Sequence, residues 1–176
     1  MSTRSAIRAE REGRVGDAIL LYRAAIEEDP SDVRATVNLA CLLWCLEDLG
    51  SPDIRRVPQD ILATCDRPPI ELLAGVVERR PDSTRAAFWL HYLRSMASGP
   101  DVDPEQCRRW LAVPNSALDP AMGLISATSG AEGHREGLML MAVCLHEGTA
   151  LARYVVSIVS GVMRRLAAAE HRNPRA

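Results

Sequence analysis

Between residues 6 and 44, small and apolar residues recur at helical spacing, and a glycine and a proline interrupt the pattern. Gly13 separates the first run from a second, and Asp29-Pro30 separates the second from a third. Proline lacks the amide hydrogen that a helix interior needs, so the second helix ends before Pro30. Each run has one apolar face that a neighbour must cover. The pattern therefore predicts three consecutive helices that pack side by side.

The small residues of these helices let their backbones approach closely, and the ring of Tyr22 fills the remaining space. The small positions are Ala6, Ala18, Ala25 and Ala40. This pattern resembles the tetratricopeptide repeat (TPR), with one whole repeat that ends at Pro30 and the first helix of the next. The resemblance covers residues 6–44 and implies antiparallel helix pairs that bind another protein.

The repeat pattern breaks after residue 50. Leu49-Gly50-Ser51-Pro52 and a proline-interrupted stretch up to Pro69 stand where the second repeat would continue. A degenerate copy of the repeat pattern follows at residues 72–94, where Pro81 occupies the place of the repeat-ending proline. We therefore expect a compact helical domain that begins with one recognisable repeat.

Helix start and stop signals continue along the rest of the chain. Ser83, Asp103-Pro104 and Asp119-Pro120 are typical of first helical turns, and Gly99 and Gly148 of helix ends. Strand signals are few, because the chain has one Phe and three Tyr and lacks alternating apolar and polar runs. The signals predict an all-α fold of about ten helices: 4–13, 16–28, 32–49, an irregular pair within 53–66, 69–80, 82–98, 104–112, 120–128, 133–147 and 149–170.

We expect these helices to form one domain over residues 1–170, since 47% of the residues are hydrophobic and can bury a sizeable core. Its expected parts are the TPR-like start at 1–50, an irregular helical region at 51–130 and a C-terminal helical pair at 131–170. Residues 171–176 are expected to form a frayed tail.

Charge and composition exclude several classes of partner. With 21 basic and 23 acidic residues, the chain has no strong positive field for nucleic acid. Glu147 and Arg153 interrupt the most apolar region, so no stretch reaches the roughly 20 residues of a membrane span. The N-terminus lacks the apolar core of a secretory signal, and the five cysteines are odd in number and scattered. These features predict a cytoplasmic protein.

The third predicted helix carries the candidate binding face. In the TPR family, ligands usually lie along the first helix of each repeat, on its concave side. The resemblance implies partner contacts at Arg34, Val37, Cys41, Trp44 and Cys45, which share one helical face. An apolar, aromatic floor with an arginine at its end suits an apolar or amphipathic peptide. Two interpretations stay open: the face is an exposed groove, or later helices cover it and Trp44 belongs to the core.

The last predicted helix has an apolar stripe along its whole length. The stripe consists of Leu151, Val155, Ile158, Val162 and Leu166. A helix this apolar has to be buried. Packing in the core is the first interpretation, an interface with a partner or a second copy is the second, and a membrane-surface helix is the third.

Residues capable of metal binding or catalysis do not form a known motif. Cys41 and Cys45 lie one helical turn apart, but no further metal ligands follow at a recognisable spacing. Cys144, His146 and Glu147 are close in sequence, yet neighbouring residues on a helix point in different directions. We expect no metal, no cofactor and no catalytic site. A helical enzyme or cofactor-binding protein that uses this second cluster is the weaker alternative.

Together these patterns predict a protein–protein interaction module, an adaptor or scaffold that binds a peptide or helix of a partner protein. A related alternative is a small bacterial chaperone, similar to TPR-like secretion chaperones, that keeps an apolar client segment in solution.

Overall fold

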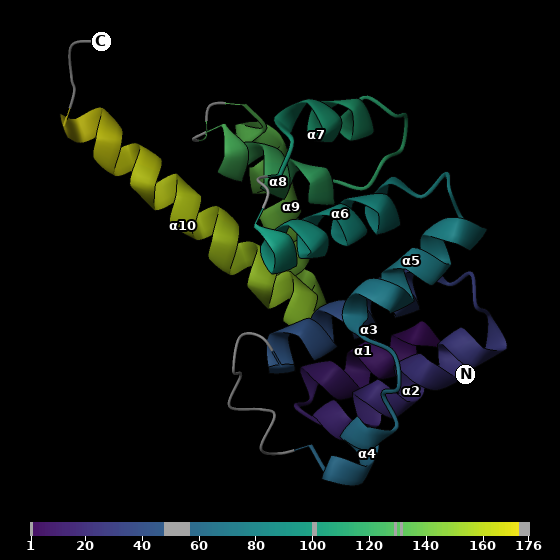
Figure 1. Ribbon diagram of the computed structural model, residues 1–176. Helices are drawn as coiled ribbons and strands as arrows, with labels where there is room; N and C mark the ends of the chain where they lie inside the picture. Colours follow the sequence, from purple (N-terminus) through teal and green to yellow (C-terminus); the bar gives the residue numbers. More distant parts are fainter. Residues whose placement is uncertain (1, 48–56, 100–101, 129, 131, 173–176) are drawn as a thin grey trace.

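The computed structural model describes residues 2–47, 57–99, 102–128, 130 and 132–172. All regular structure in these residues is helical, which confirms the predicted all-α fold of about ten helices (Figure 1). The helices are α1 (Thr3–Arg11), α2 (Val15–Glu28), α3 (Val33–Glu47), α4 (Gln59–Ala63), α5 (Pro69–Arg79), α6 (Thr84–Ser98), α7 (Pro104–Leu111), α8 (Asp119–Ala127), α9 (His134–Glu147) and α10 (Ala150–Arg172).

The helices begin and end close to the residues that the sequence signals indicate. The Ser83 hydroxyl accepts a hydrogen bond from the Ala86 amide at 3.3 Å, and Asp103 accepts one from the Glu105 amide at 2.9 Å. Gly148 ends α9 with a φ of 65°, in the left-handed region that glycine adopts without strain. Local capping chemistry therefore accounts for these three helix ends.

The observed ends of α8 and α10 differ in detail from the predicted ones. Asp119 does not cap α8; it is the first residue of that helix, and its carboxylate lies 3.2 Å from the Arg85 Nε. Helix α10 continues to Arg172, two residues into the expected tail. The last four tail residues and the predicted break around Pro52 lie outside the described residues.

Helix α10 joins the parts of the fold. It packs against α3, α8 and α9, and its Tyr154 hydroxyl lies 2.9 Å from that of Tyr92 on α6. One core cluster contains residues of α3, α5, α6, α8, α9 and α10, and a second lies mainly among α1, α2 and α3. The C-terminal end of α10 extends beyond the other helices (Figure 1). Among the described helices, none combines the length and the apolar character that crossing a bilayer requires.

Candidate functional site

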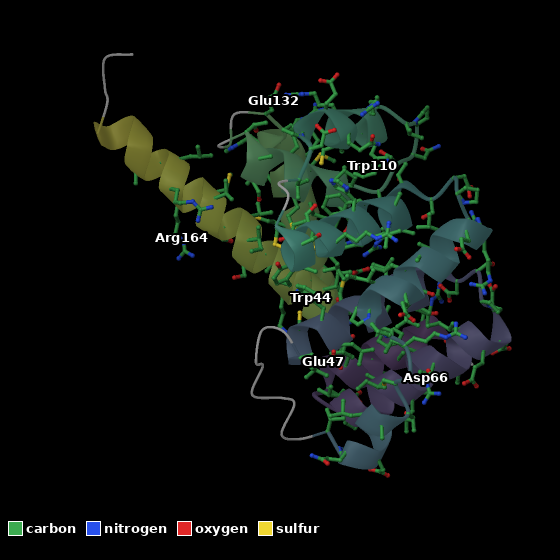
Figure 2. The ribbon with its side chains drawn as sticks, in the orientation of Figure 1. Trp44, Glu47, Asp66, Trp110, Glu132 and Arg164 are labelled. Carbon is green, nitrogen blue, oxygen red and sulfur yellow. The ribbon has the colours of Figure 1, made fainter. Side chains whose placement is uncertain are left out.

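Helices α5, α6 and α10 pack against α3 and cover the face for which the sequence predicts partner contacts. Val37 and Cys41 expose 0% and 2% of their surface and belong to the same core cluster as Val155 of α10. Cys45 is half-buried. Trp44 is also half-buried, packs against this cluster and lies near the crossing of α3 and α10 (Figure 2). A partner can reach the centre of this face only after packed helices, α10 among them, have moved away.

Moving α10 would expose a large apolar surface. Five of its side chains are at most 4% exposed: Leu151, Ala152, Val155, Val159 and Val162. Burial of a valine or leucine side chain contributes about 1.5–3 kcal/mol, so displacement costs on the order of 10 kcal/mol. This is comparable with the whole stability of a typical domain, about 5–15 kcal/mol. The α3 face is therefore not an open groove in this structure.

The predicted stripe of α10 lies in the protein core. Leu151, Val155 and Val162 are buried, and Ile158 and Leu166 are half-buried against the same cluster. The outer side of α10 carries polar residues, and Figure 2 shows Arg164 projecting from it. Little of the stripe remains for contact with a second copy.

A buried carboxylate of α1 fixes the N-terminus of α10. Glu10 is 2% exposed and accepts hydrogen bonds from the Tyr22 hydroxyl, at 2.9 Å, and from the Ala150 amide. The Asn38 Nδ2 in turn donates to the Tyr22 hydroxyl at 3.2 Å. Ala150 is the first residue of α10, so its amide has no acceptor within the helix. A residue of α1 thus caps a helix that begins 140 residues later.

This carboxylate gives a testable pH dependence. Burial raises the pKa of Glu10 above its ordinary value of 4.5, although the hydrogen bond from Ala150 opposes the shift. The folded protein then holds the proton more tightly than the unfolded chain does. The resulting stabilisation is full below about pH 4.5 and is lost as the pH rises through the raised folded-state pKa. We expect the wild type to lose stability relative to Glu10→Gln as the pH rises, in urea titrations at several pH values. A constant difference between the two proteins would contradict this assignment.

The remaining predicted residues lie at the start of α3 and at the end of α9. Arg34 is exposed and donates to the Glu147 carboxylate at 2.5 Å, at the end of α9. Cys144 is buried, and burial raises the pKa of its thiol to about 12, so the reactive thiolate is disfavoured. His146 is exposed on another side of the helix. Among the described residues, no group of three potential ligands gathers around a metal position.

Between Leu138 and Leu145 the solvent-facing side of α9 is apolar, which the sequence patterns did not predict. Leu138, Met139, Val143 and Leu145 expose 47%, 52%, 52% and 71% of their surface, and Ala142 lies exposed among them. We call these five residues the α9 outer face. A surface helix normally carries polar residues on this side. Contiguous exposed apolar side chains mark interaction sites, whereas the other large apolar residues exposed in the described chain lie elsewhere, on α2, α6 and after α7.

A hollow between three helix starts offers weaker chemistry than this face. It has a volume of about 480 Å³ and lies among the turns that precede α3, α6 and α8. Its charged groups already bind one another or nearby groups: Arg80 pairs with Asp82, and Asp29 accepts from the Ser31 hydroxyl. Groups that are paired in this way leave little free charge for a ligand.

Comparisons of this chain with protein-family models, with curated proteins and with solved structures found no match. The resemblance to the TPR family therefore stays a prediction.

Proposed function

We propose that this protein is a protein–protein interaction module that binds a peptide or helix of a partner protein on the α9 outer face. The observation that supports this proposal is the exposure of four large apolar side chains on one side of a single helix. Leaving such surface in water costs about 25 cal/mol per Å², so a partner that covers it gains free energy. The buried opposite side of α9 holds the helix rigidly against the core.

A helix is the partner element that fits this face best. The exposed side chains are spaced as Leu138, Ala142 and Leu145 in one row and Met139 and Val143 in the next. Rows at spacings of three and four residues form the ridges and grooves against which a second helix packs. Helix α9 has 14 residues and is therefore about 21 Å long, enough for three or four turns of a partner. Such helix-in-groove recognition relies on a few apolar anchors.

The test is a double substitution, Val143→Glu with Leu145→Glu. Two carboxylates on the face would have to lose water on binding, so we expect recovery of the partner to fall at least about tenfold. Both side chains are more than half exposed, and the stability of the free protein should change by less than about 1 kcal/mol. Affinity capture from cells that make the protein, followed by quantitative mass spectrometry, measures the recovery.

Met96→Glu is the matched control, because Met96 is a similarly exposed apolar residue on α6. It should leave recovery unchanged. Equal recovery of the same proteins by the wild type and the double variant would refute the proposed site.

A further inference from the structure

We propose that the segment bound by the α9 outer face is an amphipathic helix of another protein, with acidic residues placed near the C-terminal end of α9. This inference rests on the proposed function and adds the charge of the partner. It follows from the charges around Gly148, the residue between α9 and α10.

Two exposed arginines meet at this end of α9. The side chain of Arg11, on α1, packs against Gly148: a Cβ added to that glycine would lie 3.2 Å from the Arg11 Cγ. The Arg153 Nη1, in the first turn of α10, donates to the Gly148 carbonyl oxygen at 2.7 Å. The two guanidinium groups come from different helices, and both lie at the turn between α9 and α10. They form a small basic cluster beside the last exposed residues of α9.

The nearby carboxylates of α1 and α9 are buried or already paired. Glu10 is buried, is hydrogen-bonded to Tyr22 and to the start of α10, and also interacts electrostatically with Arg153. Glu147 exposes only 18% of its side chain and is paired with Arg34 at 2.5 Å.

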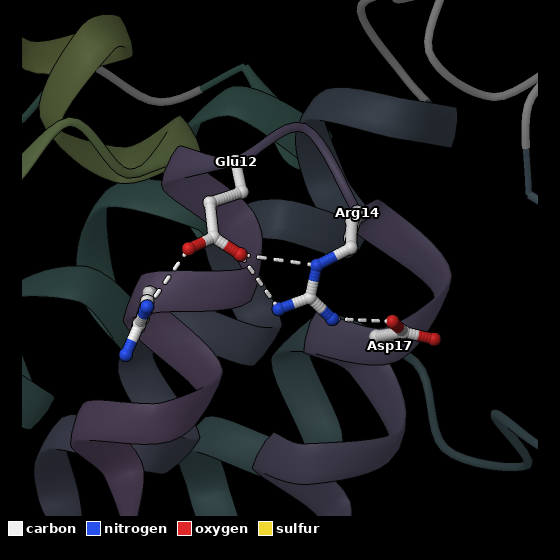
Figure 3. A network of polar contacts seen from close by, with 4 residues as sticks. Glu12, Arg14 and Asp17 are labelled. Atoms are coloured by element: carbon white, nitrogen blue, oxygen red, sulfur yellow. Dashed lines mark hydrogen bonds and ion pairs between the residues drawn. The ribbon is translucent and has the colours of Figure 1, made fainter.

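The acidic residues that follow α1 are bound by other arginines. Glu12 accepts from Arg8 at 2.9 Å and from Arg14 at 2.7 Å, and Asp17 accepts from Arg14 at 2.5 Å (Figure 3). These hydrogen bonds also hold the pKa of Glu12 below its usual range, so the Glu12 carboxylate stays charged and bound to these arginines. Neither Arg11 nor Arg153 is a member of an ion pair with another described residue. Their charge is available to a partner.

Charge and size both argue against a second copy of this chain as the occupant. Parallel pairing of two α9 helices would bring the two basic clusters together. Antiparallel pairing would offer the cluster no free carboxylate, because at the N-terminal end of α9 Glu136 is paired with Arg135 at 3.1 Å and Glu132 with Arg108 at 2.5 Å. One side of a 14-residue helix is also smaller than the roughly 800 Å² per subunit of a stable interface. A partner with carboxylates at this end forms charge-assisted hydrogen bonds instead.

The experiment is a selection of displayed helical peptides on the intact protein. The peptides share a leucine stripe, and their polar positions vary among Glu, Lys, Gln and Ser. We expect the retained peptides to be acidic, and a retained peptide to bind at least about tenfold more tightly than its Glu→Lys counterpart at low salt.

The preference for acidic peptides should disappear with Arg11→Gln/Arg153→Gln and reverse with Arg11→Glu/Arg153→Glu. The control Arg67→Glu/Arg94→Glu changes two exposed arginines elsewhere and should keep it. Thermal unfolding checks that each variant is folded.

The outcomes separate this inference from the proposed function. If peptides are retained and are lost with Val143→Glu/Leu145→Glu, but show no acidic preference, the inference is overturned and the proposed function stands. If retention does not depend on Val143 and Leu145, both fail. If sedimentation of the protein alone reveals a dimer that this double substitution dissociates, the occupant is a second copy and the inference is also overturned.

Discussion

Val155→Asp is expected to lower the free energy of unfolding by at least about 4 kcal/mol, whereas Val143→Asp should change it by less than about 1 kcal/mol. The two valines lie on neighbouring helices but in opposite environments. Val155 of α10 is fully buried in the core, and Val143 of α9 is 52% exposed. An aspartate at position 155 would place an unpaired charge in an apolar interior, which costs several kcal/mol. Urea denaturation followed by circular dichroism measures both variants.

The pair of substitutions separates a core helix from an interface helix. The chemical change is the same, so differences in side-chain size and helix propensity cancel. If Val155→Asp is tolerated as well as Val143→Asp, α10 is not part of the core, and its stripe becomes a candidate interface. If both variants unfold, the α9 outer face is covered within the folded protein.

Trp44→Ala is expected to lower the free energy of unfolding by about 2–3 kcal/mol, somewhat less than for a fully buried tryptophan, because Trp44 is half-buried. Its ring packs against the core cluster that contains Val37 and Cys41. Its Nε1 has no hydrogen-bond acceptor among the described residues, so the loss arises from packing alone. Trp44→Phe keeps most of the apolar contact and should lose less than half as much. Thermal or urea unfolding measures both variants, and partner capture follows for each.

The opposite result would restore the face predicted from the TPR resemblance. If Trp44→Ala leaves stability unchanged and abolishes capture of a partner, the α3 face binds that partner in spite of its coverage by α10. If Trp44→Ala loses stability and Trp44→Phe still captures the partner, Trp44 belongs to the core.

The helices could be predicted from the sequence because their signals are local. Ser83, Asp103 and Gly148 act within a few residues of their own positions, and each lies at the helix end that it predicts. The burial of the α10 stripe could also be predicted, since so wide an apolar surface has few alternatives to the core. These inferences needed no knowledge of tertiary contacts.

The location of the candidate surface could not be predicted in this way. Coverage of the α3 face depends on packing between elements more than 100 positions apart in the chain, such as α3 and α10. The role of Glu10 depends on the backbone amide of Ala150, and a backbone amide leaves no trace in the sequence. One local signal of the α9 outer face does exist: Gly137–His146 contains no Asp, Glu or Arg on any side. A helix that is apolar on all sides is normally buried on all sides. In the described fold, one side of α9 packs against the core and the α9 outer face remains exposed.

The most direct test of the α9 outer face is photo-crosslinking from single positions in cells that make the protein. A photoreactive amino acid replaces Val143 or Leu145 in one set of variants and Met96 or Arg94 in another. We expect positions 143 and 145 to give an adduct with a different protein. We expect this adduct to disappear when the other residue of the pair is changed to Glu, and positions 94 and 96 to give none. Adducts of equal yield from both sets, or adducts only with a second copy of this chain, would contradict the proposed binding site.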